Sequence, residues 1–345
     1  MSCYHPLKGF SLGKTADGKS IMKVVPYSVD HMEFNHGRWY GVDTHFRGQT
    51  AEKAVYDFVE IPCGKCIGCI LQKSREWANR CMMELSYHEQ ACFITLTYDD
   101  VHVPMSIYGV PATGEMKRSL TLRKRDFQLF MKRLRKLLGD VQIRFFASGE
   151  YGSKTMRPHY HAIIFGWFPD DAYWWQTKRE GKLVSDYFRS PTLERLWPYG
   201  MSLVGNVEWR SCAYVARYTA KKQYKGVFDF EEHGMEPPFL LMSRKPGLAK
   251  QYYLDNPDCC RYNKVILPKS DKDDCPDVPV PKYFRILFDK DFPEESFELK
   301  QMRQKAMANA RRAKTVNTDL SYLELLQVEE DNKIQRTKSL ARKDL

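Results

Sequence analysis

Apolar runs and alternating apolar and polar positions mark four segments of the chain as β-strands. These segments are residues 92–98, 142–148, 160–166 and 202–209. Between the last two lies a Trp-rich stretch, residues 167–199, which we expect to form an insertion beside the sheet. The pattern therefore predicts a sheet that is interrupted by one long insertion.

Helical periodicity recurs along the chain. Residues 126–138 carry an apolar stripe with basic side chains off it, and Gly139 can end this helix. A helix is also expected after Cys69, and residues 213–222 are predicted to be helical. From about Glu294 the composition changes to charged, helix-favouring residues, which indicates a helical arm at the C-terminal end.

Residues 13–20 fit the spacing of a phosphate-binding P-loop, but their context does not suit one. A P-loop must open a helix whose first amides face the phosphates. In this chain Ser20 is followed by Ile-Met-Lys-Val-Val-Pro, which is β-prone and ends in proline. Asp17 and Gly18 between two extended segments are instead typical of a hairpin turn, so we expect a hairpin and no ATP site.

Charge points to the class of partner. The 345 residues include 54 Lys and Arg against 43 Asp and Glu, which gives a net charge of +11. An excess of cations favours a polyanion such as nucleic acid, because binding releases counterions from the phosphates. No apolar run approaches the roughly 18 to 20 residues that span a bilayer, and no signal peptide is recognisable. We therefore expect an intracellular protein that does not bind membranes.

Two histidines and a glutamate form the first candidate site. His159 and His161 are two residues apart on a predicted strand, so both point to the same face. Glu150, near the end of the preceding strand, can supply a third, oxygen ligand. Two imidazoles and one carboxylate leave coordination positions open, as a catalytic metal requires. Mg²⁺ or Mn²⁺ suits this set and Zn²⁺ is also compatible, whereas two surface histidines are the alternative.

Two tyrosines form the second candidate site. Tyr214 and Tyr218 are one helical turn apart, and Lys221 and Lys222 lie within the next turn. A phenol is a weak nucleophile near neutral pH, and a neighbouring cation would favour the reactive phenolate. Half-buried packing is the alternative role for such a pair.

Three cysteines follow one another at intervals of three residues: Cys63, Cys66 and Cys69. This spacing suits a tetrahedral thiolate site for structural Zn²⁺, with a fourth ligand from Cys3, His5 or Cys81. An iron–sulfur cluster and unliganded thiols are the alternatives. Cys259, Cys260 and Cys275 lack such a spacing.

Three segments, taken in order, resemble the three motifs of the HUH rolling-circle replication initiators. They are residues 93–99 (Phe-Ile-Thr-Leu-Thr-Tyr-Asp), 157–165 (Arg-Pro-His-Tyr-His-Ala-Ile-Ile-Phe) and 214–222 (Tyr-Val-Ala-Arg-Tyr-Thr-Ala-Lys-Lys). The paired tyrosines and residues 62–66 and 243–247 are similar to the initiators of small microviruses of the gokushovirus type.

The resemblance implies an α+β fold with a ferredoxin-like or RRM-like HUH endonuclease core around a central antiparallel sheet. Residues 91–226 would form this core, with the insertion near 167–199. Residues 1–90 would form a Cys-containing region and residues 227–345 a partly helical, basic extension.

The resemblance also implies a reaction. With Mg²⁺ or Mn²⁺ held by His159 and His161, Tyr214 or Tyr218 would attack a phosphodiester of single-stranded DNA at a phage origin. The products are a free 3′-hydroxyl and a 5′-phosphotyrosine, from which the second tyrosine later allows release of a circular genome. Lys222 matches the lysine of the motif. The expected partners are the origin DNA and a host helicase and polymerase, in the cytoplasm of an infected bacterium.

Two kinds of alternative remain open. Within the same chemistry, the chain could be a plasmid initiator, a relaxase or a transposase. In a different class, it could be a non-catalytic zinc-binding adaptor for nucleic acid.

Overall fold

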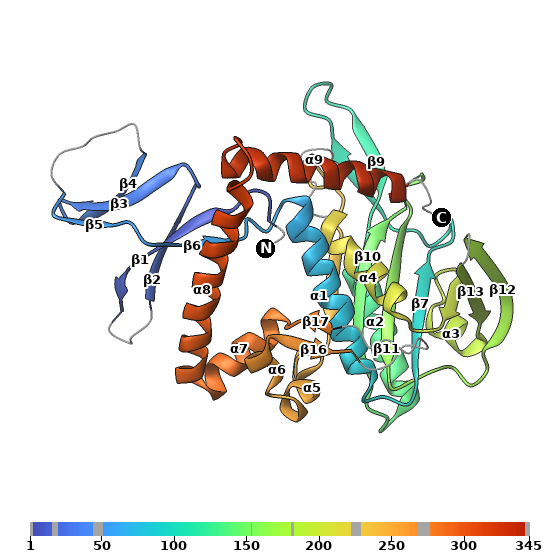
Figure 1. Cartoon of the computed structure of the whole chain (residues 1–345). Coiled ribbons are helices and arrows are strands. Elements are labelled where there is room, and N and C mark those ends of the chain that lie inside the picture. Colours follow the sequence, from blue (N-terminus) through green and yellow to red (C-terminus); the bar gives the residue numbers. More distant parts are fainter. Residues whose placement is uncertain are drawn as a thin grey trace. The chain divides into compact units, whose positions relative to one another are not determined.

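The computed structural model describes residues 3–15, 20–43, 51–152, 154–180, 183–221, 229–267 and 277–341 (Figure 1). The chain divides into two compact units. One contains residues 1–72 and 294–345, and the other contains residues 73–293.

The described residues of the second unit build a seven-stranded sheet in the order β12-β13-β14-β7-β11-β10-β15, and every neighbouring pair is antiparallel. Its strands are β7 (Ala91–Thr97), β10 (Arg144–Tyr151), β11 (Pro158–Phe165), β12 (Tyr173–Glu180), β13 (Leu183–Arg189), β14 (Ser202–Gly205) and β15 (Phe239–Met242). The short antiparallel pairs are β8 (Met105–Gly109) with β9 (Met116–Leu120), and β16 (Lys264–Ile266) with β17 (Asp277–Pro279).

Helices pack on both faces of this sheet. They are α1 (Ile67–Leu85), which begins in the first unit, α2 (Lys124–Leu138), α3 (Pro191–Leu196), α4 (Trp209–Lys221), α5 (Lys250–Asp255), α6 (Cys259–Tyr262) and α7 (Lys282–Asp291). The α+β class and the antiparallel sheet expected from the sequence are thus confirmed.

The apolar stripe of α2 packs on one face of the sheet. Phe127, Phe130 and Leu134 are buried against the side chains of Tyr160 and Ile164 from β11. The helix ends where Gly139 adopts a φ of 60° and its backbone N–H donates to the carbonyl of Arg135. The prediction of a helix over residues 126–138 is confirmed, with two further residues at its start.

The opposite face of the sheet is covered by α4 and by the second half of α1. Trp77 of α1 stacks on Phe146 of β10 with the ring centroids 5.0 Å apart. The indole of Trp209 at the start of α4 donates to Asn79 Oδ1 of α1 at 2.8 Å. Because His159 and His161 alternate with Tyr160, they project to this second face, under α4.

Two sequence predictions are corrected. Residues 167–199 do not lie beside the sheet, since β12 and β13 within them extend its edge through the pairing of Tyr187 with Gly205 of β14 (Figure 1). An edge strand still has unpaired backbone groups, and these strand-forming residues satisfy them. The strand predicted over 202–209 ends at Gly205, because Trp209 already begins α4 and makes its indole contact with α1.

In the first unit, β1 (Leu7–Lys14) pairs with both β2 (Ser20–Val25) and β6 (Phe58–Ile61). The hairpin prediction is confirmed, because Ser20 begins a strand and not the helix that a P-loop requires; residues 16–19 of the turn lie outside the described residues. A second sheet contains β3 (Val29–Asn35), β4 (Arg38–Asp43) and β5 (Lys53–Val55). The predicted C-terminal helices are present as α8 (Pro293–Thr315) and α9 (Tyr322–Ala341).

Candidate metal and nucleophile site

The register of the β10–β11 hairpin brings the three predicted ligands together. Glu150 of β10 lies opposite His159 of β11, and Ser148 lies opposite His161. Residues opposite each other in an antiparallel pair project to the same face. The glutamate and both histidines therefore gather on the face that α4 covers.

The side chains point at one another. Oε1 of Glu150 lies 3.0 Å from Nε2 of His159 and 2.8 Å from Nε2 of His161. The two imidazole rings are 5.0 Å apart between centroids and nearly perpendicular. Glu150 is 1% exposed and His161 is 6% exposed, whereas His159 is half-buried. The site is thus shielded from water around the carboxylate and open at His159.

The other nitrogen of His159 determines where its proton lies. Nδ1 is 3.1 Å from the carbonyl oxygen of Arg157, which can only accept, so Nδ1–H donates and Nε2 of the neutral ring carries a lone pair. That lone pair faces a carboxylate oxygen. Two acceptors at this distance require a cation between them, either a proton or a metal ion.

The carboxylate of Glu150 is poised for the same purpose. Burial raises the pKa of Glu150, but hydrogen bonds from His159 and His161 outweigh the effect of burial and hold the pKa below its usual value. Its second oxygen, Oε2, is buried and has no hydrogen-bond partner among the described residues. A buried, ionised oxygen without a partner is costly unless a ligand completes it.

Two residues of β7 orient His161, and the sequence analysis did not single them out. Thr95 Oγ1 lies 2.9 Å from Nδ1 of His161, and the ring of Phe93 stacks on the imidazole at 5.6 Å with an interplanar angle of 8°. Thr95 lies opposite His161 in the sheet register. The signal was present in the sequence, because Phe93 and Thr95 alternate along a predicted strand and so share a face.

Tyr214 of α4 reaches the ligand group. Its hydroxyl lies 3.5 Å from Nε2 of His161, and the two rings meet edge to face with centroids 4.9 Å apart. Phe93 also contacts Tyr214 edge to face. The side chain of Tyr218 and the whole of Lys222 lie outside the described residues, so Tyr214 is the predicted nucleophile that the structure places.

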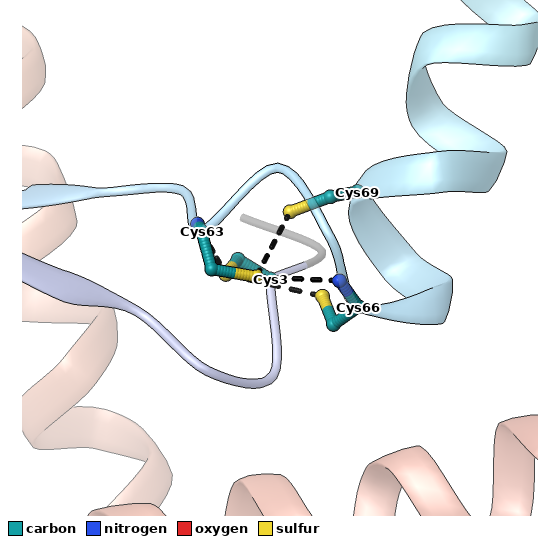
Figure 2. A group of neighbouring side chains, drawn as sticks. All are labelled: Cys3, Cys63, Cys66 and Cys69. Atoms are coloured by element: carbon teal, nitrogen blue, oxygen red, sulfur yellow. Dashed lines mark hydrogen bonds between the residues drawn. The ribbon is translucent and has the colours of Figure 1, made fainter. Parts of the chain in front are cut away.

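A second group of possible ligands lies in the first unit. The sulfur atoms of Cys3, Cys63, Cys66 and Cys69 are all within 4.8 Å of one another (Figure 2). Of the three candidates for a fourth ligand, Cys3 joins the group. His5 instead contacts Glu330, and Cys81 lies fully buried farther along α1. Cys259 and Cys260 lie in α6, and Cys275 lies outside the described residues.

Comparison with known proteins identifies the family. A family model described as replication-associated protein ORF2 matches residues 91–223. Replication-associated protein ORF2 of Spiroplasma virus 4 is 31% identical over 272 residues, which cover 77% of this chain and 80% of that protein. The chain belongs to this family of replication-associated proteins. Replication-associated protein VP4 of Bdellovibrio phage phiMH2K is 33% identical over 247 residues, 69% of this chain and 70% of that protein.

A third replication-associated protein, ORF4 of Chlamydia phage 1, is 33% identical over 166 residues, 47% of this chain and 38% of that protein. The resemblance to microvirus replication initiators is thereby confirmed, and the family model spans the histidines, Glu150 and Tyr214. No solved structure matches the chain, so the ferredoxin-like HUH assignment stays a prediction. None of the described helices of this replication-associated protein has the length and apolar character needed to cross a membrane.

Proposed function

We infer that this replication-associated protein is a metal-dependent endonuclease that nicks single-stranded DNA at a phage origin through a covalent tyrosine intermediate and later rejoins the ends. The observation that carries this proposal is the position of the Tyr214 hydroxyl, 3.5 Å from Nε2 of a histidine that shares a carboxylate oxygen with a second histidine. A nucleophile and a ligand set on one side of a sheet are what phosphodiester transfer requires.

The ligand set fits a divalent cation with open coordination positions. Two imidazole nitrogens and one carboxylate leave room for phosphate oxygens and water. The proton position of His159 and the buried Oε2 of Glu150 both support this assignment. A Mg²⁺ or Mn²⁺ ion bound at these residues would polarise the scissile phosphate and fix its orientation.

The tyrosine carries the covalent step. The phenol oxygen of Tyr214 or Tyr218 forms a bond to the phosphorus while the bond to the 3′ oxygen breaks, and that oxygen takes up a proton. The products are a free 3′-hydroxyl, which can prime synthesis, and a 5′-phosphotyrosine, which conserves the bond for rejoining without ATP. A phenol with a pKa near roughly 10 needs help to ionise, and we assign this role to Lys222.

The pair of tyrosines permits a second transfer. After one round of synthesis, the second phenol attacks the regenerated origin, and the released 3′-hydroxyl attacks the first phosphotyrosine to close a circle. The reaction would take place in the cytoplasm of an infected bacterium, beside a host helicase and polymerase. The α+β core that holds these residues would then be of the HUH type.

The test is to incubate the full chain with Mn²⁺ and end-labelled single-stranded origin DNA and to count adducts that survive denaturation. Wild type, Tyr214→Phe, Tyr218→Phe and the double variant are compared, with Tyr262→Phe as a matched control because Tyr262 is 76% exposed on α6. Adducts should require Mn²⁺, persist in the control and vanish in the double variant.

The outcome also separates this proposal from its main alternative. The four clustered cysteines favour a zinc-binding nucleic-acid adaptor as the second candidate function. An adaptor would bind DNA equally well in all variants and form no adduct. Absence of adducts from metal-loaded wild type on several phage origins would therefore overturn the nickase.

A further inference from the structure

Four cysteines meet where three segments of the first unit converge (Figure 2). Cys3 precedes β1, Cys63 and Cys66 lie between β6 and α1, and Cys69 lies in the first turn of α1. The meeting follows from the antiparallel pairing of β1 with β6, in which Leu7 lies opposite Ile61. The residues just before β1 and just after β6 must therefore lie at the same end of this sheet.

The distances between the sulfur atoms match a tetrahedral metal site. Sγ of Cys63 lies 4.0 Å from Sγ of Cys69, and Sγ of Cys66 lies 4.0 Å from Sγ of Cys3. Thiolates bound to Zn²⁺ at about 2.3 Å in a tetrahedron are about 3.8 Å apart. A disulfide would bring two sulfurs to about 2.05 Å, so the four thiols are arranged around a common centre and not in bonded pairs.

Backbone amides point at the sulfur atoms. The N–H of Cys63 donates to Sγ of Cys3 at 3.2 Å, the N–H of Tyr4 donates to Sγ of Cys66 at 3.4 Å, and Sγ of Cys63 accepts from the N–H of Cys66 at 3.3 Å. Such donors stabilise negative charge on sulfur. Gly64, with a φ of 74°, provides the left-handed turn that wraps the chain around Cys63.

The surroundings favour a structural metal. Cys3, Cys66 and Cys69 are buried, and the apolar residues packed against them are Tyr4 and Cys63. Four protein ligands leave no open position, unlike the set at Glu150. Nearby, β2 is mostly exposed, so this end of the unit has little apolar core to hold its segments together.

We propose that Cys3, Cys63, Cys66 and Cys69 bind one Zn²⁺ in a closed tetrahedral site that ties the segment before β1 to the start of α1. Binding releases the thiol protons and involves no change of oxidation state. The site is separate from the nickase centre, and its metal differs in kind, because soft thiolates select Zn²⁺ over Mg²⁺ or Mn²⁺.

The first measurement is the metal content of the purified full chain after dialysis against metal-free buffer. We expect about one zinc per chain in the wild type and its loss in Cys3→Ser and Cys66→Ser. His5→Ala tests the rival fourth ligand, and Cys275→Ser is matched for the loss of one thiol; both should retain zinc. Cys3→His, which keeps a zinc-binding side chain, should restore part of the content.

A second measurement keeps the proposal testable where a serine variant fails to fold. Wild-type protein in which Co²⁺ replaces the bound metal should show the intense visible bands of a tetrahedral cobalt thiolate. Zinc-free wild type, iron with the absorption of an iron–sulfur cluster, or zinc retained by Cys3→Ser but lost from His5→Ala would each overturn the assignment. None of these readouts depends on nicking, so a failed nickase test leaves the zinc assignment unaffected.

Discussion

At the scale of single residues, the candidate site depends on which nitrogen of each histidine faces the carboxylate. The His-x-His spacing predicts a shared face, and the structure confirms it. The orientation of each ring comes from residues outside the motif: the carbonyl of Arg157 for His159, and Thr95 with Phe93 for His161. Both Nε2 atoms consequently face Glu150.

Replacing Glu150 should disable metal binding. We expect Glu150→Ala to weaken Mn²⁺ affinity at least about tenfold, because the only carboxylate placed within 3.0 Å of both imidazoles in the described part of the chain is lost. Isothermal titration calorimetry measures the change, and Glu115→Ala, in the exposed turn between β8 and β9, is the control. Full Mn²⁺ affinity in Glu150→Ala would remove this residue from the ligand set.

Thr95 should act as a positioning residue through His161. A ring that binds metal through Nε2 carries its proton on Nδ1, which Thr95 Oγ1 can accept at 2.9 Å. We expect Thr95→Val to weaken Mn²⁺ binding roughly tenfold, and Thr95→Ser to restore it because the hydroxyl returns. Thr97→Val makes the same chemical change on the same strand as a control. Equal affinity in Thr95→Val and wild type would contradict the assignment.

At the scale of secondary-structure elements, the apolar patterns identify most strands and the α2 helix, but not which strands pair. Nothing local in residues 167–199 shows that β13 continues the sheet beyond β14. Likewise, the start of α4 depends on the indole contact between Trp209 and Asn79, two residues far apart in the sequence. Such long-range contacts are absent from a local pattern.

A buried carboxylate joins three elements of the second unit. Glu84 of α1 is 4% exposed and lies 2.8 Å from Nε of Arg144 on β10 and 3.1 Å from Nε2 of His88, and it accepts the backbone N–H of Ala249 before α5. Burial raises the pKa of Glu84, but the hydrogen bonds from His88 and Ala249 and the charge of Arg144 outweigh the effect of burial and lower the pKa.

This lowered pKa predicts the pH dependence of stability. A depressed pKa means that the ionised group stabilises the fold above the pKa of the unfolded chain, and that this contribution disappears as the pH falls through the folded pKa. At pH 7, Glu84→Gln should lower the free energy of unfolding by about 2 kcal/mol. Glu89→Gln, an exposed neighbour, should have little effect.

Urea unfolding at a series of pH values measures the difference between wild type and Glu84→Gln. The difference should shrink below about pH 4.5, where the wild-type carboxyl itself becomes neutral. A difference that is the same at neutral and acidic pH would show that the charge of Glu84 does not contribute.

At the scale of the whole molecule, the net charge of +11 should govern affinity for single-stranded DNA. We expect the logarithm of the association constant to fall linearly with the logarithm of salt concentration, with a slope of about −0.7 per neutralised phosphate. Fluorescence anisotropy between about 0.05 and 0.2 M NaCl measures it. Tyr214→Phe should keep the slope, since it removes no charge, and an affinity independent of salt would contradict electrostatic binding.

The sequence alone determined the main strands, the helix over residues 126–138, the shared face of His159 and His161, and the motifs that place the chain among microvirus replication initiators. These features are local, because side-chain periodicity and residue spacing are properties of a short segment. Tertiary structure decided which cysteine joins Cys63, Cys66 and Cys69, how β12 and β13 extend the sheet, and which groups orient the imidazoles. Each of these depends on contacts between residues distant in the chain, which strand register and helix packing bring together.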